Sequence, residues 1–219
     1  MLPLLPPPHR LLKFEHQAQS EGFQWIIGVD EAGRGPLAGP VVASAVLLRD
    51  TRFANRIFDS KQITPRQRER AFHEIFDKAY VGIGIMSESV IDQLNILRAT
   101  HWAMASAVRR LMAQIPAYPA IVERQPQRVC LLIDGCSFES DLPFCVKTIV
   151  RGDAQSLSIA SASIVAKVYR DRLLACFDRI YPQYGFRQHK GYPTRQHRQA
   201  IQEHGLSPFH RKTFHVAVV

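Results

Sequence analysis

The stretch formed by residues 26–40 constrains the fold of this chain more than any other part of the sequence. An apolar run, residues 26–29, leads to two adjacent acidic residues, Asp30 and Glu31, and then to a turn rich in Gly and Pro. A second apolar run follows at residues 41–48. This order predicts a strand, an acidic pair at its end, a tight loop and a second strand.

The loop has the composition of a site that binds phosphate or sugar. Neighbouring side chains of a regular strand point to opposite faces, so Asp30 and Glu31 share one site only if the strand ends or twists there. Gly33 and Gly35 permit that bend and leave backbone N–H groups open to a ligand, and Arg34 adds a rigid fork of donors. Carboxylates for a metal beside donors for a phosphodiester indicate nuclease chemistry. The alternative is a solvated acidic turn in which Gly and Pro serve only the bend.

Size and charge narrow the class of protein. A chain of 219 residues is long enough for one domain with a full core, or for one domain with a small appendage. Lys and Arg number 28 against 19 Asp and Glu, and the resulting net charge of +9 favours a polyanionic partner such as nucleic acid. The alternative is a basic protein without such a partner.

Location can also be predicted from composition. The longest apolar run is too short to span a bilayer, and the proline-interrupted first residues do not resemble a signal peptide. The four cysteines form no C-x-x-C pair, which favours free thiols and a cytoplasmic location.

Hydrophobic periodicity and turn residues divide the chain into three parts. Residues 1–24 are predicted to be a poorly ordered extension with a short helix at 10–19, residues 25–180 a single α/β domain, and residues 181–219 a basic, aromatic C-terminal region. The predicted strands are 25–29, 41–48, 81–86, 129–133 and 146–150. The predicted helices are 65–79, two within 88–115, 156–180 and 193–204, with a linker at 121–128.

Four carboxylates follow predicted strands. Asp30 and Glu31 end the first strand, Asp134 ends the fourth, and Asp153 follows the fifth. If these strand ends meet at one edge of the sheet, the carboxylates converge and repel one another unless cations neutralise them. Oxygen ligands suit Mg²⁺ or Mn²⁺, and two such ions can activate a water and stabilise a leaving oxygen.

Other polar residues have competing interpretations. Asp171 competes with Asp153 as the fourth acid, but its neighbours Arg170 and Arg172 favour an ion pair. His210 and His215 have a spacing seen in zinc sites, but no Cys pair accompanies them. Five basic residues of the C-terminal region are expected to form a phosphate-facing surface or, alternatively, a solvated basic face: Arg187, Arg195, Arg198, Arg211 and Lys212.

Several segments, in order along the chain, together resemble the bacterial ribonuclease HII family. The resemblance extends over roughly residues 25–215 and is carried by residues 28–39 (GVDEAGRGPLAG), 59–61 (DSK), 94–97 (LNIL), 133–135 (IDG), 151–153 (RGD), 161–171 (SASIVAKVYRD), 184–186 (YGF) and 189–194 (HKGYPT). Arg151 stands where the family usually has Lys, which keeps the positive charge.

The resemblance implies an RNase H-like α/β fold: a five-stranded mixed sheet flanked by helices, followed by a small helical C-terminal region. It also implies a metal-dependent endoribonuclease that hydrolyses the RNA of RNA–DNA hybrids and incises 5′ to single ribonucleotides in duplex DNA, leaving 3′-OH and 5′-phosphate ends. The family's catalytic and metal-binding acids carry over to Asp30, Glu31, Asp134 and Asp153, with Mn²⁺ or Mg²⁺ as cofactor and two ions expected with substrate.

The resemblance further assigns the reading of the 2′-OH to Gly33, Arg34 and Gly35, and a substrate contact to Tyr192. The residues themselves suggest phosphate or backbone contacts for Lys61, His189 and Lys190. We expect a monomer whose partners are RNA–DNA hybrids and ribonucleotide-containing DNA, with a role in ribonucleotide removal during DNA repair and replication. Two alternatives stay open: another nuclease of the same superfold, which would not require a ribose, and a non-catalytic hybrid-binding protein, which would gain nothing from clustered carboxylates.

Overall fold

A computed structural model describes residues 11–116 and 118–214 of the chain. One mixed five-stranded sheet forms its centre, with strand order β3-β2-β1-β4-β5. The strands are β1 (Trp25–Ala32), β2 (Val41–Leu48), β3 (Ala79–Met86), β4 (Val129–Asp134) and β5 (Cys145–Ile149). All five predicted strands are present, and the predicted fold class is confirmed.

The register of the central strand determines where the acidic residues meet. β1 pairs with β2 in antiparallel orientation and with β4 in parallel orientation, Val29 lying opposite Ile133. Because β1 and β4 run in the same direction, Asp30 and Asp134 lie toward the same end of the sheet, at the carboxyl ends of the two strands. Strand β1 continues three residues beyond its predicted end, since its pairing with β2 extends to Ala32 opposite Val42.

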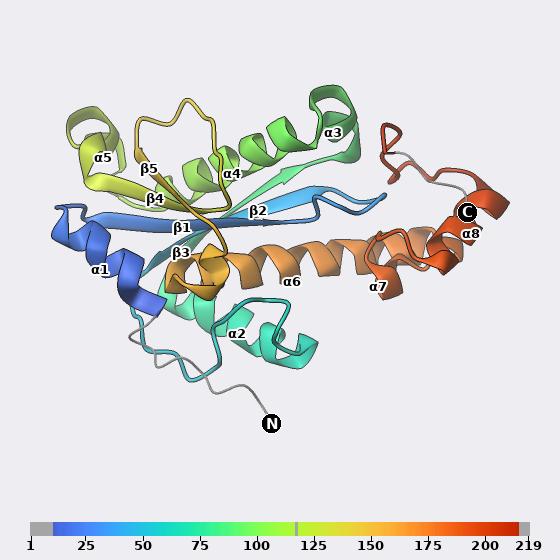
Figure 1. The fold of residues 1–219 in the computed structure, drawn as a ribbon, viewed down its shortest axis with the longest axis horizontal. Coiled ribbons are helices and arrows are strands. Elements are labelled where there is room, and N and C mark those ends of the chain that lie inside the picture. The colour runs from blue at the N-terminus through green and yellow to red at the C-terminus, as the bar shows by residue number, and fades with distance from the viewer. Residues whose placement is uncertain (1–10, 117, 215–219) are drawn as a thin grey trace.

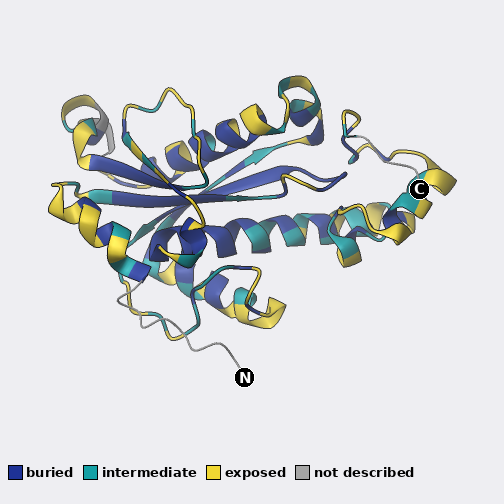
Figure 2. Ribbon diagram, viewed as in Figure 1, coloured by how far each residue is buried: buried dark blue, intermediate teal, exposed yellow. Residues whose placement is uncertain are grey.

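Helices cover both faces of the sheet (Figure 1). On one face lie α3 (Glu88–Leu94) and α4 (Ile96–Met112), and on the other lie α2 (Pro65–Lys78) and the 24-residue α6 (Leu157–Ile180). The first half of α6 is almost wholly buried (Figure 2). Close contact with the sheet requires strand glycines, because a Cβ on Gly28 would lie 2.2 Å from the Ser158 carbonyl carbon, and one on Gly84 would lie 1.9 Å from the Ala103 oxygen.

Two segments differ from their predicted structure. The predicted linker at 121–128 contains α5 (Tyr118–Arg124) and a short 3₁₀ helix, Pro126–Arg128, which are too short for a helical period to stand out in the sequence. The short helix predicted at 10–19 is present as α1 (Lys13–Ser20), but its Glu15 and Ala18 are buried, so this part of the extension is packed and not poorly ordered. Residues 1–10, the remainder of the segment predicted to be poorly ordered, lie outside the described residues.

The C-terminal region forms a small helical cluster beyond the end of α6 (Figure 1). It contains α7 (Phe186–His189) and α8 (Arg195–His204), and α8 begins two residues later than predicted because Thr194 caps it. A separate apolar cluster that includes Leu174, Tyr184 and Phe186 holds this region on α6. Of the helices in the described residues, none has the length and apolarity needed to cross a membrane.

Candidate active site

A cleft of about 380 Å³ opens at the edge of the sheet where β1 and β4 end. Three of the predicted acids line it: Asp30, Glu31 and Asp134. The loop after β1 and the C-terminal region form the other walls. The cleft is lined by Asp30, Glu31, Ala32, Gly33, Arg34, Gly35, Ser60, Lys61, Asp134, Ser163, Lys167, Arg170 and Tyr192.

Burial and mutual repulsion perturb these acids. Asp30 is 5% exposed, and its pKa is raised well above the usual range by burial first and then by the charges of Glu31 and Asp134. Its Oδ1 accepts a 2.7 Å hydrogen bond from the Glu31 backbone N–H. Burial also raises the pKa of Glu31, although the nearby Arg34 guanidinium, 3.4 Å away, acts in the opposite direction. The cleft therefore holds carboxylates that a cation would stabilise in their charged form.

Asp153 joins the group from a different element. It lies in a 3₁₀ turn, Gly152–Ala154, which is tied to β4 by a 2.6 Å hydrogen bond from the Gly152 N–H to Asp134 Oδ1. Burial, followed by the charges of Asp59 and Asp134, raises the pKa of Asp153 to about 6, whereas Lys61 opposes the rise. Asp153 does not line the cleft itself, but its charge interacts with Asp134 and Lys61, which do.

The donor set fits a hard divalent cation. Asp30, Glu31, Asp134 and Asp153 offer only carboxylate oxygens, the ligands that Mg²⁺ and Mn²⁺ prefer. In the part of the chain that the structure describes, no three His, Cys, Asp or Glu side chains are grouped as ready-made ligands. Asp134 Oδ1 accepts from the Gly152 amide and Glu31 Oε1 from Arg34, which leaves the second oxygen of each carboxylate for a cation.

The loop after β1 brings a glycine against the protein interior and two further residues to the cleft. Gly33 has a φ of +100°, and a Cβ there would lie 2.1 Å from Arg170 Nε, so no other residue fits. Arg34 and Gly35 are exposed and line the cleft. A Cβ on Gly35 would lie 3.8 Å from Tyr192 Cε1, which places the loop beside the tyrosine ring.

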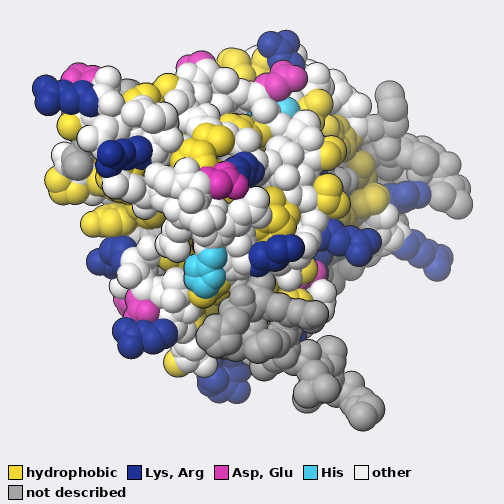
Figure 3. Space-filling model, turned by 60° about the vertical axis from the view of Figure 1, so that its left-hand side comes forward, with side chains coloured by type: hydrophobic (Ala, Val, Ile, Leu, Met, Phe, Trp, Pro, Cys, Tyr) yellow, Lys and Arg dark blue, Asp and Glu magenta, His cyan; other side chains and the backbone are white. Residues whose placement is uncertain are grey.

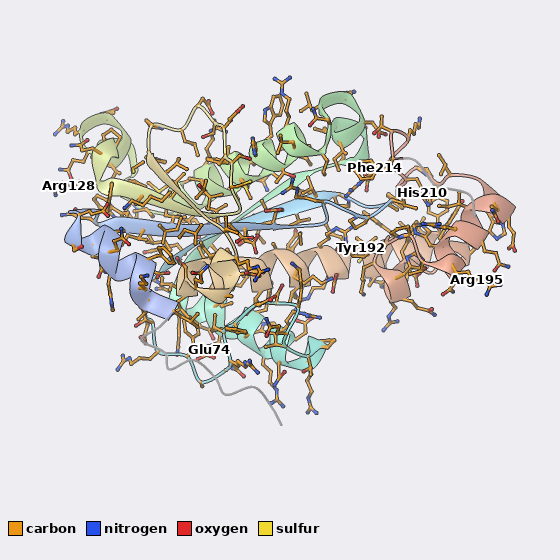
Figure 4. The ribbon with its side chains drawn as sticks, in the orientation of Figure 1. Glu74, Arg128, Tyr192, Arg195, His210 and Phe214 are labelled. Atoms are coloured by element: carbon orange, nitrogen blue, oxygen red, sulfur yellow. The ribbon has the colours of Figure 1, made fainter. Side chains whose placement is uncertain are left out.

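Tyr192 is the part of the C-terminal region that reaches the cleft. Its side chain is 45% exposed and lies on the inner side of the region, whereas Arg195 lies on the outer side (Figure 4). Neither His189 nor Lys190 lines the cleft. His189 Nε2 lies 2.6 Å from the Tyr184 carbonyl oxygen and its Nδ1 accepts from the Gly191 N–H, so both ring nitrogens have partners within the protein.

The ion pair expected for Asp171 has a different partner. Asp171 pairs with Lys167 at 2.7 Å, because residues four apart share one face of a helix whereas adjacent residues do not. Arg172 pairs with Glu69, and Arg170 is buried against backbone carbonyls.

Arg211 and His210 are both buried in the C-terminal region and differ from what the sequence predicted for them. Arg211 does not belong to a phosphate-facing surface, because it is only 1% exposed and bonds to carbonyls of the loop after β1. His210 Nε2 lies 3.0 Å from His197 Nε2, and His210 Nδ1 accepts from the Ser207 N–H, so His210 belongs to a hydrogen-bonded pair of rings. His215, its partner in the zinc interpretation, lies outside the described residues.

Three residues of the cleft, Ser60, Ser163 and Lys167, were not predicted from the sequence as site residues. Ser163 bonds to Ser60 at 3.0 Å and its hydroxyl also lowers the pKa of Asp30. Lys167 is held at the cleft by Asp171, and burial lowers its pKa. All three lie in segments whose resemblance to the family was recognised, but their side chains gave no signal of their own.

Comparisons with known structures define the class of fold. The structure resembles that of ribonuclease H2 from Pyrococcus horikoshii, with a TM-score of 0.63 and 24% identity, covering 89% of this chain and 95% of the other. It also resembles Bst-RNase HIII in complex with Mn²⁺, with a TM-score of 0.60 and 16% identity, covering 86% of this chain and 65% of the other. At these identities the likeness establishes the RNase H-like fold.

Sequence comparisons establish the family. The family profile of ribonuclease HII matches residues 27–217. A ribonuclease HII of Ruminiclostridium cellulolyticum is 49% identical over 206 residues, covering 94% of this chain and 75% of the relative. One from Syntrophus aciditrophicus is 47% identical over 204 residues, covering 93% of this chain and 90% of the relative. The chain belongs to the ribonuclease HII family and is a metal-dependent endoribonuclease that acts on RNA–DNA hybrids.

Proposed function

We propose that this enzyme also incises duplex DNA on the 5′ side of a single embedded ribonucleotide, leaving 3′-OH and 5′-phosphate ends. The observation that carries the proposal is the composition of the cleft, where three carboxylates, the loop of residues 33–35 and the Tyr192 ring face one space. A site that contains both a group for the ribose and a group for its neighbour can distinguish a ribonucleotide followed by DNA from DNA alone.

In the proposed mechanism, Asp30, Glu31, Asp134 and Asp153 would hold Mg²⁺ or Mn²⁺, with two ions expected when substrate is bound. When bound, such ions supply Lewis-acid activation of water and stabilisation of the leaving oxygen. Protein groups do the rest. The Ser163 hydroxyl lowers the pKa of Asp30 and so favours its charged form, and Lys61 contributes positive charge that acts on Asp153.

Substrate selection is assigned to the loop and the tyrosine. The 2′-OH both donates and accepts hydrogen bonds, and we assign its donors to the backbone N–H groups of Arg34 and Gly35, which line the cleft. Tyr192 packs against the deoxyribose that follows the ribonucleotide and thereby selects the RNA-to-DNA step. Lys190 and His189 contribute at most to the support of Tyr192, since neither lines the cleft. We further propose that the enzyme works as a cytoplasmic monomer in ribonucleotide removal during replication and repair.

The proposal is tested with a DNA duplex carrying one ribonucleotide and with an all-DNA duplex of the same sequence. Each is incubated with the protein and Mg²⁺, Mn²⁺ or EDTA, and the cut is mapped. We expect metal-dependent incision 5′ to the ribonucleotide, no cut in the control duplex, and loss of at least about 100-fold in rate for Asp134→Asn. The matched control is Asp141→Asn, which removes an exposed carboxylate paired with Arg109 and should cut normally.

Other outcomes separate the alternatives. Cutting of both duplexes would indicate a nuclease that does not read the ribose. Binding of the ribonucleotide duplex without cutting under either metal would indicate a binding protein for this substrate. A normal rate for Asp134→Asn would remove the basis for the assignment of the acids.

A further inference from the structure

Two arginines are buried beneath the loop that follows β1. Arg170 of α6 and Arg211 of the segment after α8 are each 1% exposed. Within the described residues, no carboxylate lies within 4 Å of either guanidinium. Their hydrogen bonds go instead to backbone carbonyl oxygens, which is an unusual use of two charged side chains in a protein interior.

Arg211 contacts the loop at three positions. Its Nε and Nη2 both donate to the Gly39 oxygen, at 3.0 and 2.7 Å. Its Nη1 donates to the Arg34 oxygen at 2.9 Å, and its Nη2 also donates to the Gly33 oxygen at 2.5 Å. One planar guanidinium therefore binds the carbonyls at both ends of the loop, which the single ammonium of a lysine could not span.

Arg170 joins the same loop to the segment that carries Tyr192. Its Nε donates to the Pro40 oxygen and its Nη2 to the Ala38 oxygen, both at 2.9 Å. Its Nη1 donates to the Lys190 oxygen, also at 2.9 Å. A backbone hydrogen bond of 2.8 Å from the Leu37 N–H to the Gly191 oxygen reinforces this junction. The loop and the tyrosine segment thus share one buried support.

The two arginines bind the backbone acceptors of the loop and leave its backbone donors facing the cleft. The carbonyls of Gly33, Arg34, Ala38, Gly39 and Pro40 all point inward to a guanidinium. Among the described residues, by contrast, no acceptor takes the N–H groups of Arg34 and Gly35, which lie at the cleft. Donors are therefore left for a substrate, while the acceptors that would repel a phosphate are turned away.

A distant anchor keeps Arg211 in place. Asp92 of α3 accepts hydrogen bonds from the backbone N–H groups of Lys212 and Thr213, both at 3.0 Å, and from the Thr213 hydroxyl at 2.7 Å. These bonds clasp the two residues that follow Arg211. They lie outside the cleft, so Asp92 acts on the loop only through the position of the arginine.

We propose that Arg170 and Arg211 are positioning residues for ribonucleotide specificity, because they hold the loop of residues 33–40 and the Tyr192 segment in one fixed arrangement with the loop N–H groups facing the substrate. The inference rests on the proposed reading of the 2′-OH by this loop. Arg211 does not line the cleft, and Arg170, which does, directs its guanidinium hydrogen bonds to backbone carbonyls. Their effect is on geometry, and a displacement of about 1 Å at such a site reduces catalysis by about 100-fold.

The test compares Arg170→Lys and Arg211→Lys with Arg172→Lys. All three keep the charge, and Arg172 is an exposed residue of the same helix as Arg170, paired with Glu69. Two readouts are needed: amide hydrogen exchange of residues 33–40 and 190–192 without substrate, and kcat/KM for duplexes with one ribonucleotide or its 2′-fluoro analogue. We expect faster exchange in both segments and a loss of about 10- to 100-fold in the preference for 2′-OH, with Arg172→Lys unchanged.

Asp92→Asn provides a second variant in case a buried lysine prevents folding. Asp92→Asn should also speed amide exchange in residues 33–40 and 190–192 and reduce the preference for 2′-OH, but by less than the arginine variants. Unchanged exchange in folded Arg170→Lys, Arg211→Lys and Asp92→Asn proteins would overturn the inference, as would equal losses on both duplexes. If the wild-type enzyme does not cut the ribonucleotide duplex, the proposed function fails, whereas the exchange experiment still decides whether the arginines hold the loop.

Discussion

Glu15 offers a direct test of how the N-terminal helix supports the active site. Its Oε1 accepts three hydrogen bonds at the start of α6: from the Ser156 hydroxyl at 2.6 Å, the Ser158 N–H at 2.9 Å and the Ser158 hydroxyl at 2.7 Å. Ser156 is the N-cap of α6 and follows Asp153 by three residues. A carboxylate here also complements the positive end of the helix dipole. Replacing it should therefore loosen both the helix start and the turn that carries Asp153.

The magnitude follows from the bonds that are lost. A hydrogen bond to a charged group contributes about 1.5–3 kcal/mol, but the two serine hydroxyls can re-pair with each other, 3.1 Å apart. We therefore expect Glu15→Ala to reduce the free energy of unfolding by about 3 kcal/mol, and Glu15→Gln by less because its amide oxygen can still accept. With a urea slope of about 3 kcal/mol/M, the midpoint should fall by about 1 M.

The assay is urea unfolding followed by far-UV circular dichroism, with the initial rate on an RNA–DNA hybrid measured in parallel without denaturant. The control is Glu21→Gln, which removes the carboxylate of an exposed ion pair with Lys147 just after the same helix and should leave the midpoint unchanged. An unchanged midpoint and rate for Glu15→Ala would show that α1 does not support α6, and the reasoning from these three bonds would be refuted.

Three further predictions concern other parts of the structure. Burial lowers the pKa values of His197 and His210 to about 4, so the stability contributed by the neutral rings is fully present above pH 6.5 and falls as the pH drops toward 4. In urea titrations, the free energy of unfolding should decrease by about 2 kcal/mol per histidine between pH 7 and pH 5. A flat pH profile would contradict the neutral pair. Gly28→Ala should destabilise the protein by at least about 3 kcal/mol, because the added Cβ would overlap the backbone of α6 at Ser158. A melting temperature within about 2 °C of wild type corresponds to less than about 1 kcal/mol and would disprove this contact. Mn²⁺ should raise the melting temperature of the wild type more than that of Asp134→Asn, and equal shifts would place the ion elsewhere.

The sheet and the meeting of the acids could be predicted because both follow from short-range patterns. Apolar runs of strand length mark β1 and β4, and parallel strands in register bring the residues at their ends together. Asp30 and Asp134 therefore meet for a reason that the sequence contains. Asp153 was placed correctly after β5, but its turn depends on the amide of Gly152 reaching Asp134, which is a contact across 18 residues.

The buried arginines could not be predicted in the same way. Arginine is usually exposed, and neither Arg170 nor Arg211 carries a local signal of burial. Most of their partners are carbonyls of residues 33–40, more than 100 positions away in the chain. Any residue type has a backbone carbonyl, so the sequence of the loop does not reveal that it accepts these bonds. The helix α1 was underestimated for a similar reason, since its anchor Glu15 bonds to serines about 140 residues later.

The location of the positive charges predicts how the enzyme responds to salt. On the side of α1 and α5, Lys and Arg side chains are scattered among Asp and Glu (Figure 3), and the C-terminal region adds exposed basic residues such as Arg187, Arg195 and Lys212. Charges in solvent are screened over about 10 Å at 0.1 M salt, but the guanidiniums of Arg170 and Arg211 are shielded from ions.

Raising the salt from 50 to 200 mM should therefore weaken the encounter with a duplex and leave the bound geometry intact. We expect KM for an RNA–DNA hybrid to rise by about 10-fold or more, while kcat changes by less than about twofold, measured in steady state at saturating Mg²⁺. Lys61→Gln should flatten the dependence of KM on salt, because it removes an exposed positive charge that lines the cleft. A fall in kcat with salt at constant KM would place the screened charges in the catalytic geometry, in conflict with the burial of Arg170 and Arg211.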